Sequence, residues 1–393
     1  MNENCLKDKS VIRVGSYRGH GIISNYLAES ALEFMDIGFA FPGRYTGLTL
    51  VHFDEYRYGR LVSSRRFGIR LRSISLAIQR IQPYLLNFVI AFVVLVFVTR
   101  NQKKYDIFLM TSMSPASLLV KMLGVAKRSV LLSDDTYCLE GHLLNRAIQS
   151  FLLIVEKNLQ NSLKEIWYVS PRLIKFKQQQ KIIENLNVRR KIVPHGVDLR
   201  WLKWRASQKI EETTIAYFGA VVPGRGLELL LDSLNKVIEF VPNAKLKIVG
   251  EEIESYGKVL RGSVLSLNLQ DHVQFIGHGK NEEDDLKKIA TCAIGVAIYD
   301  GTQISILYTD SSKIKKYLSC GMPVMVSSRL PYSIDIEKAR AGIAVSNDRD
   351  SIASALIRFL TDSSLRKELS VNATKYGTEF EYHHIYGEAF RSF

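Results

Sequence analysis

The sequence predicts an α/β protein with two domains, each built around a parallel sheet. Three observations support this fold class. The chain has 393 residues, which is more than one hydrophobic core usually serves. Hydrophobic residues make up 47% of the chain and charged residues 23%, an ordinary composition for a folded protein. Apolar runs of strand length alternate with segments of helical periodicity, and this alternation restarts near Glu211.

The first half opens with a strand at 10–15, a glycine-bearing loop, and apolar residues at helical spacing over 22–34. Strand, glycine loop and helix make a Rossmann-type opening, although the loop is not a dinucleotide-binding fingerprint. Further strands are expected at 48–53, 106–111, 129–133 and 165–170, and further helices near 116–123 and 143–163. The polar stretch 200–212 marks the expected domain boundary, so the first domain is placed at 1–199.

The second half repeats the same alternation of strands and helices. Strands are expected at 214–218, 245–249, 272–276, 294–298, 323–327 and 342–345, with helices between them. The second domain is therefore placed at 200–374. The remaining segment, 375–393, is rich in aromatic residues and is expected to form one last helix.

Positive charge is concentrated in one part of the chain, whose formal net charge is +14. No acidic residue lies between Glu55 and Asp106, whereas arginine recurs from Arg57 to Arg80, and an apolar run follows at 84–98. That run is shorter than the roughly 18 residues that indicate a membrane span. A buried helix, a helix that dips into a bilayer face, and a span are the three alternatives. Basic charge beside apolar surface is typical of interfacial binding, so a membrane surface is the expected partner of 57–98.

The sequence also bears on other partners and on the location of the protein. No known nucleic-acid module is present, so nucleic acid is not expected as a partner. The four cysteines show neither metal spacing nor a paired pattern, which favours reduced thiols and a cytoplasmic location. The first ten residues are polar and mixed in charge, so no secretory signal is expected. No cluster has the spacing of a zinc site, and no metal or cofactor is implied.

Two stretches in the second half have the character of phosphate sites. Each joins a strand or loop, a glycine, a cation and a helix start: one spans 217–226 and the other 310–324. Open amides and the helix dipole attract anions at such a place, and glycine lets the backbone approach closely. Two such sites about a hundred residues apart suggest a pyrophosphate held between separate elements. The residues expected to bind it are Gly219, Arg225, Gly226, Ser312, Lys313 and Tyr317.

The order of these motifs resembles that of GT-B glycosyltransferases, in particular the family 4-like group. The run Pro194-His195-Gly196-Val197-Asp198 is similar to the proline-x-glycine-valine-aspartate turn that links the two domains in that group. The family then shows glycine, arginine, lysine and glycine. Gly219 and Gly226 stand in the glycine positions, Ala220 replaces the arginine, and Arg225 replaces the lysine.

The second motif departs further from the common family pattern. Two glutamates are usual there, but this chain has Tyr308 and Lys316 in their places. A subset that includes bacterial exopolysaccharide transferases has Ser/Pro-x-Lys-x-x-x-Tyr instead, which Ser312, Lys313 and Tyr317 resemble. In that subset the lysine contacts the donor pyrophosphate, so the resemblance assigns this contact to Lys313. It also implies that the loop carrying Glu251 lies near the nucleotide base.

The resemblance implies two Rossmann-like domains that face each other across a cleft, with the final helix, 375–393, crossing back to the first domain. It implies transfer of a sugar from a UDP- or GDP-sugar, held by the second domain, to an acceptor hydroxyl held by the first. We expect a lipid-linked glycan of cell-surface polysaccharide synthesis as acceptor, at the inner face of the cell membrane. A catalytically silent partner subunit and a sugar-nucleotide epimerase of the same fold are the alternatives.

Candidate catalytic residues lie in the first half. Asp134 and Asp135 follow the strand 129–133, at the sheet edge where open α/β sheets bind their ligands. A carboxylate there could deprotonate an acceptor hydroxyl, or the pair could simply cap a helix or form a turn. His20 stands between two glycines and could face the acceptor or the transferring phosphate.

Overall fold

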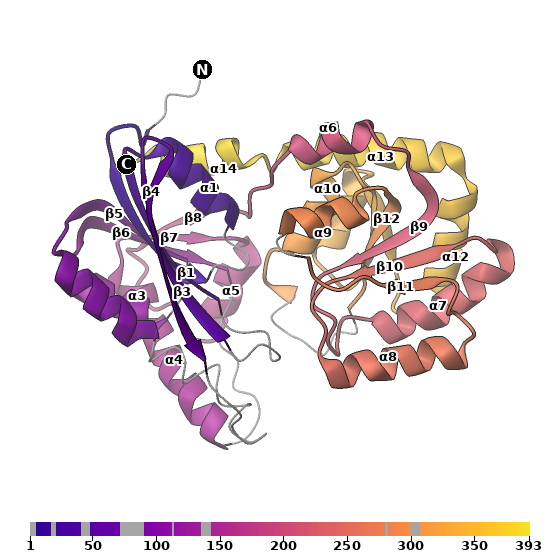
Figure 1. The fold of residues 1–393 in the computed structure, drawn as a ribbon, viewed down its shortest axis with the longest axis horizontal. Coiled ribbons are helices and arrows are strands. Elements are labelled where there is room, and N and C mark those ends of the chain that lie inside the picture. Colours follow the sequence, from indigo (N-terminus) through magenta and orange to yellow (C-terminus); the bar gives the residue numbers. More distant parts are fainter. Residues whose placement is uncertain are drawn as a thin grey trace. The chain divides into compact units, whose positions relative to one another are not determined.

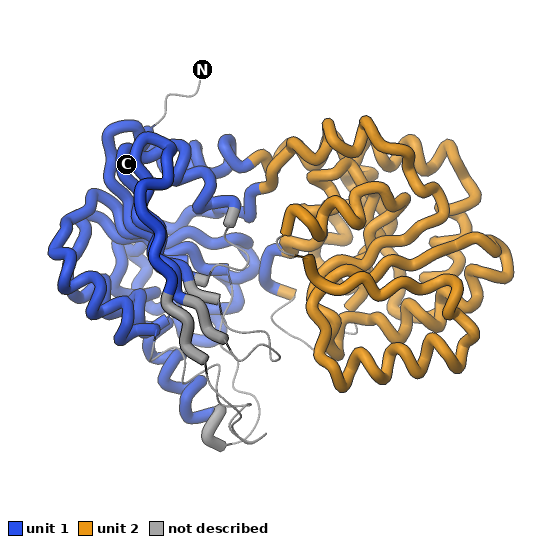
Figure 2. Tube along the Cα trace, in the orientation of Figure 1, with its two compact units in different colours: residues 1–196, 308–310, 382–393 blue, residues 197–307, 311–381 orange. Residues whose placement is uncertain are grey.

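The computed structural model describes residues 5–16, 21–40, 48–70, 90–111, 114–134, 143–279, 282–299 and 307–393. The chain forms two compact units, coloured separately in Figure 2. Unit 1 comprises Met1–Gly196, Tyr308–Asp310 and Tyr382–Phe393, and unit 2 comprises Val197–Leu307 and Ser311–Glu381. Helices cover a mainly parallel sheet in each unit (Figure 1), so the predicted α/β class is confirmed.

Unit 1 is built on an eight-stranded sheet with the order β4-β3-β2-β1-β5-β6-β7-β8. Its strands are β1 (Ser10–Ser16), β2 (Glu33–Ala40), β3 (Leu48–Arg57), β4 (Arg60–Arg70), β5 (Tyr105–Thr111), β6 (Ala126–Ser133), β7 (Glu165–Tyr168) and β8 (Arg189–Ile192). Six of them pair in parallel. Strand β3 runs antiparallel to β2 and β4, so an antiparallel hairpin forms one edge of the sheet.

Two strands of unit 1 differ from the prediction. The helix expected over 22–34 is α1 (Gly21–Ser30), and β2 begins three residues later at Glu33. Strand β2 is buried on both faces, with Met35 and Ile37 on one face and Phe34 and Asp36 on the other, so it lacks the alternation of a half-exposed strand. Strand β4 was not predicted, because its side chains from position 60 to 66 are largely exposed and show no periodicity.

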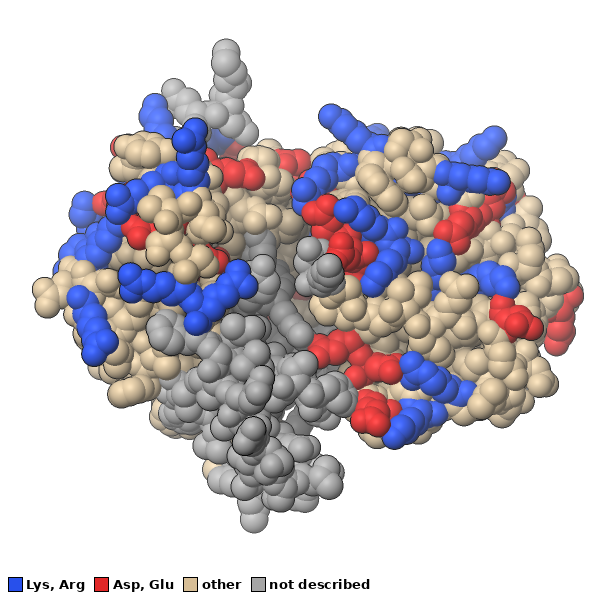
Figure 3. Space-filling model, in the orientation of Figure 1, with Lys and Arg blue, Asp and Glu red and all other residues tan. Residues whose placement is uncertain are grey.

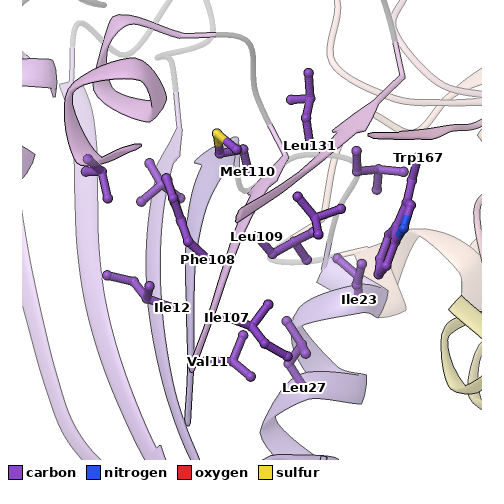
Figure 4. Close-up of a cluster of buried hydrophobic side chains, with 14 of the residues drawn as sticks. Val11, Ile12, Ile23, Leu27, Ile107, Phe108, Leu109, Met110, Leu131 and Trp167 are labelled. Carbon is purple, nitrogen blue, oxygen red and sulfur yellow. The ribbon is translucent and has the colours of Figure 1, made fainter. Parts of the chain in front are cut away.

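The other helices of unit 1 are α3 (Pro115–Met122), α4 (Leu143–Ser162), α5 (Pro171–Gln179) and α14 (Tyr382–Phe390). Figure 4 shows part of the core, in which side chains of β1, β5 and β6 meet α1 and Trp167 of β7. The C-terminal α14 completes this core, because Phe390 packs edge-on against Trp167 at 4.8 Å and stacks on Tyr26 at 6.0 Å between ring centroids.

The apolar run 84–98 lies partly outside the described residues. Positions 90–101 are helical. Ile90, Val94 and Val98 are buried, and Phe97 stacks on Phe53 with 4.1 Å between ring centroids. The described part of this run therefore packs on the core of unit 1, as the buried-helix alternative expects. In the described ranges of the chain, no helix has both the length and the apolar character needed to cross a membrane.

Unit 2 is built on six parallel strands with the order β11-β10-β9-β12-β13-β14. The strands are β9 (Glu211–Phe218), β10 (Lys245–Val249), β11 (Val273–Phe275), β12 (Cys292–Ala297), β13 (Val324–Ser327) and β14 (Gly342–Val345). The helices are α6 (Arg200–Ala206), α7 (Leu227–Phe240), α8 (Glu254–Ser266), α9 (Glu282–Ile289), α10 (Ser312–Ser319), α11 (Tyr332–Lys338), α12 (Arg349–Thr361) and α13 (Ser363–Thr378). Two apolar clusters form its core.

The C-terminal segment is two helices and not one. Helix α13 ends at Thr378, and α14 starts at Tyr382. Between them the carbonyl of Phe380 accepts a hydrogen bond from the Val197 amide at 2.7 Å. Helix α13 belongs to unit 2 and α14 to unit 1, so this break is where the chain passes from one unit to the other.

Candidate functional site

The carboxyl end of β9 lies against the loop that follows β10. Gly219 has φ +126°, and its amide donates to the Val249 carbonyl at 2.9 Å. The Val221 amide donates to the carbonyl of Glu251 at 2.8 Å. A Cβ on Gly250 would lie 1.9 Å from the Gly219 oxygen, so the two loops are in close backbone contact. Gly219 and Glu251, both predicted as donor-binding residues, therefore belong to adjacent loops.

Helix α7 begins at a glycine that no other residue could replace without strain. Gly226 is its N-cap residue, with φ +67°, and no side chain caps the helix. A Cβ at Gly226 would lie 2.8 Å from Ile298 Cγ2 and 2.9 Å from the Ile298 oxygen. The glycine thus lets the start of α7 approach the end of β12 closely. The uncapped first-turn amides and the half-buried Arg225 before them form a favourable place for an anion.

The Lys313 ammonium is buried without a hydrogen-bond partner. It lies in the first turn of α10, whose N-cap Ser311 accepts from the Ile314 amide at 3.5 Å. Lys313 is 9% exposed, and its Nζ finds no acceptor in the part of the chain that the structure describes. Instead Nζ lies 4.0 Å from the ring centroid of Tyr217 and 5.3 Å from that of Tyr299. A buried cation without an anion is costly, so its position calls for a negatively charged ligand.

Gly219 and Arg225 surround the same cation. A Cβ on Gly219 would lie 3.7 Å from Lys313 Nζ, so the glycine backbone adjoins the ammonium directly. The guanidinium carbon of Arg225 lies 5.4 Å from the Tyr299 ring centroid. Burial, and then repulsion from Arg225, lowers the pKa of Lys313 well below its usual value. An anion near both cations would remove this repulsion and stabilise the charged lysine.

Tyr317 positions helix α10 within the core of unit 2. It is fully buried, and its hydroxyl accepts from the Phe218 amide at 2.7 Å and lies 3.2 Å from the Val296 oxygen, to which it can donate. A Cβ on Gly295 would lie 2.4 Å from the Tyr317 ring, so this glycine makes room for the ring. The side chain therefore fixes α10 against β9 and β12, which places Ser312 and Lys313 at the carboxyl ends of those strands.

The positions that depart from the family's acidic motif have other contacts here. Lys316 forms an ion pair with Glu282 at 2.8 Å. Tyr308 stacks on Phe176 at 4.4 Å between ring centroids, within unit 1. The neighbouring Lys315 is buried, with 4% of its surface exposed. Its Nζ lies 4.4 Å from the ring centroid of Phe380.

The candidate residues of unit 1 are only partly described. His20 and Asp135 lie outside the described residues. Asp134 is half-buried and directly follows Ser133 of β6. The Ser133 hydroxyl accepts from Lys177 Nζ at 2.7 Å, and Lys177 pairs with Glu156 at 2.5 Å, both fully buried. Across the ranges given above, no three His, Cys, Asp or Glu side chains gather as a metal site would require.

Comparison with known proteins agrees with this geometry. Residues 202–376, which carry all of the unit 2 site, match the family model of glycosyl transferases group 1. No curated protein sequence matches the chain. Many solved structures share its fold, among them sucrose-phosphate synthase from Thermosynechococcus elongatus. That structure has a TM-score of 0.68 and 14% identity, and the match covers 98% of this chain and 99% of that one.

Two further structures resemble the chain over nearly its whole length. HepE from Anabaena in complex with UDP has a TM-score of 0.65 and 15% identity, and the match covers 98% of this chain and 100% of that chain. A UDP-forming α,α-trehalose-phosphate synthase from Burkholderia xenovorans, in complex with glucose-6-phosphate, has a TM-score of 0.70 and 12% identity, with 97% and 99% covered.

The fold defines the structural class: the chain has the GT-B fold of glycosyltransferases. Within that fold, residues 202–376 form a glycosyl transferases group 1 domain. The predicted resemblance to GT-B enzymes is therefore confirmed.

Proposed function

We propose that this enzyme transfers a sugar from a uridine diphosphate sugar to an acceptor hydroxyl, with the donor held by unit 2. The observation that carries this proposal is the buried Lys313 ammonium, which has no hydrogen-bond acceptor in the described ranges and adjoins Gly219. A diphosphate beside it would supply the missing negative charge. UDP in the complex of HepE, a protein of the same fold, supports uridine as the base.

Several residues of unit 2 would bind the diphosphate, each through a different interaction. As the bond from the sugar to the diphosphate breaks, negative charge grows on the leaving phosphate oxygen. Lys313 would stabilise it as a point charge, and Arg225 could bind two phosphate oxygens through parallel hydrogen bonds. The amides that follow Gly226 and the α7 dipole would add to this field. Glu251 would lie nearer the nucleoside, and Tyr317 would hold α10 in place.

The acceptor belongs to unit 1 in this proposal. A donor domain at 200–374, an acceptor domain at 1–199 and a returning segment at 375–393 follow from the family resemblance. The carboxylates of Asp134 and Asp135 would accept the proton of the attacking hydroxyl, and His20 would face the same substrate. The Ser133 hydroxyl accepts a hydrogen bond from Lys177 Nζ. This contact fixes the end of β6, which Asp134 directly follows.

We further propose that the acceptor is a lipid-linked glycan at the inner face of the cell membrane, in cell-surface polysaccharide synthesis. The basic stretch from Arg57 to Arg80, which contains no acidic residue, supports a membrane partner with an anionic surface. A second candidate is a catalytically silent partner subunit. Ala220 and Lys316 favour it, because both stand where related transferases have donor contacts of a different charge.

Nucleotide binding tests the central proposal. A specific ligand at a hundred times its dissociation constant stabilises a protein by about 2.7 kcal/mol, which thermal unfolding detects. UDP and UDP-glucose should raise the melting temperature, GDP should raise it less, and the Lys313→Met variant should lose most of the shift. Lys287→Met is the matched control, because this lysine is exposed and pairs with Glu283 on the surface of α9. A wild-type protein that no nucleotide sugar stabilises would refute the proposal.

A further inference from the structure

The β3–β4 hairpin leaves one edge of the unit 1 sheet open. Strand β4 is the outermost strand in the sheet order, so no strand of the described residues lies beside one side of its backbone. Positions 60–62 and 64–66 are exposed, which leaves both faces of the strand uncovered as well. Sheets of α/β proteins are normally covered on both faces, and proteins rarely leave a long edge unprotected. The exposed hairpin is therefore a candidate binding surface.

Large apolar side chains gather at the end of the hairpin. Tyr58 is 78% exposed, Leu61 54% and Val62 55%. Tyr58 and Gly59 form the turn, with φ +47° and +77°, the conformation of a tight hairpin turn. Single exposed apolar residues are common on protein surfaces, but three within five positions of an open edge form a patch.

Uncompensated positive charge lies on the same strand. Arg60, Arg65 and Arg66 are exposed and form no ion pair with any described residue. Arg57, at the end of β3, differs because Glu55 binds its guanidinium at 3.1 Å. On the face drawn in Figure 3, Lys and Arg side chains also lie over other parts of unit 1. The hairpin thus combines three guanidinium groups, none of them paired by a described carboxylate, with an aromatic and two aliphatic side chains.

We propose that the β3–β4 hairpin docks the enzyme on an anionic membrane surface. Each arginine near anionic lipid headgroups adds attraction, while Tyr58, Leu61 and Val62 enter the boundary between headgroups and acyl chains. A nucleic acid would engage the arginines but would leave the aliphatic pair unused. A second copy of the chain that paired along β4 would bring its arginines against these arginines, which is destabilising. An anionic lipid surface is the partner that would contact both the arginines and the apolar side chains.

This inference deepens the proposed function, because docking would bring a lipid-linked acceptor within reach of unit 1. It does not depend on transfer activity. Vesicle binding is measured without any nucleotide sugar, and nucleotide binding by unit 2 is measured without vesicles. Failure of one proposal is therefore distinguishable from failure of the other.

Co-sedimentation with vesicles tests the proposal. Wild-type protein should bind vesicles of phosphatidylglycerol and phosphatidylcholine far better than pure phosphatidylcholine, and high salt should weaken binding. Replacing Arg60, Arg65 and Arg66 with glutamine should lower the partition coefficient by roughly 100-fold, from the usual attraction per basic residue. Replacing Tyr58, Leu61 and Val62 with serine should lower it as well. Both variants should keep the UDP-induced thermal shift, which shows that they fold.

A matched triple variant separates the hairpin from net charge. Replacing the exposed residues Lys209, Arg358 and Lys367 of unit 2 with glutamine removes the same charge elsewhere. This control should bind vesicles as the wild type does. Equal binding by the wild type and the arginine variant would overturn the proposal. So would hairpin-dependent dimerisation in light scattering, or hairpin-dependent RNA binding without vesicle binding.

Discussion

Binding of a diphosphate beside Lys313 should be coupled to the uptake of a proton. In the free protein, burial and then repulsion from Arg225 lower the pKa of Lys313, so part of the population is neutral above that pKa. A bound diphosphate favours the charged lysine and raises the pKa again. Between the two pKa values a proton binds together with the nucleotide. The affinity must therefore fall as the pH rises, by up to tenfold per pH unit.

The groups that face Lys313 support this assignment. The rings of Tyr217 and Tyr299 favour the cation, while Arg225 opposes it. Burial raises the pKa of both Tyr217 and Tyr317, so neither hydroxyl ionises in the range of the experiment. Of Lys313, Tyr217 and Tyr317, only the lysine has a lowered pKa, so a proton taken up with the nucleotide is assigned to Lys313.

Titration calorimetry with UDP between about pH 7.5 and 9.5 measures the effect, because the last phosphate ionisation, near pH 6, is complete there. Repeating each titration in buffers of different ionisation enthalpy gives the number of protons taken up. Lys313→Met should abolish the uptake. It should also weaken binding by roughly 10- to 150-fold, since a hydrogen bond to a charged group contributes about 1.5–3 kcal/mol. Lys313→Arg stays charged and should show no uptake.

The result that would refute this reasoning is equally specific. If wild-type affinity for UDP is the same across the range, Lys313 is charged before the nucleotide arrives or does not contact it. If the Lys313→Met variant takes up as many protons as the wild type, another group carries the linkage. The Lys287→Met control should match the wild type in both affinity and proton uptake.

Three further predictions concern the stability of the units. Gly226→Ala should lower the melting temperature of unit 2 and weaken UDP binding, because a left-handed alanine costs about 1–2 kcal/mol before any clash. Tyr317→Phe should destabilise unit 2 by about 1–3 kcal/mol in urea unfolding, since the buried Phe218 amide loses its acceptor. Lys177→Met should cost about 3–5 kcal/mol by leaving Glu156 buried and charged, and adding Glu156→Leu should restore most of the loss. Equal destabilisation by the single and double variants would contradict that ion-pair argument.

Much of unit 2 could be predicted from the sequence, because its strands are short apolar runs that alternate with amphipathic helices. The structure explains why two positions of unit 2 require glycine, which the sequence alone did not. Gly219 and Gly226 have positive φ and admit close neighbours, which is why the motif requires glycine there. Lys313 was also predicted, but its burial was not, since a lysine in a helical sequence is usually exposed.

The rest depended on contacts between distant parts of the chain. The expected helix 22–34 took in the first two residues of β2, and the rest of this strand was not predicted, because periodicity cannot separate a short buried strand from a helix. The aromatic setting of Lys313 was missed for a similar reason. Tyr217 and Tyr299 each lie at or just after the end of a strand, and only the parallel pairing of β9 with β12 brings their rings together around the ammonium. The long-range pairing carries no local signal.

The contribution of α14 to unit 1 has a consequence for biosynthesis. Unit 1 starts at the N-terminus, yet Tyr386, Ala389 and Phe390 are buried in its core. A growing chain usually completes its N-terminal domain first. Here the part of the N-terminal half that packs against Tyr386, Ala389 and Phe390 stays uncovered until α14 has been translated, and all of unit 2 is translated before α14. A nascent chain truncated before Tyr382 should therefore bind chaperones through its first half, even after unit 2 has folded.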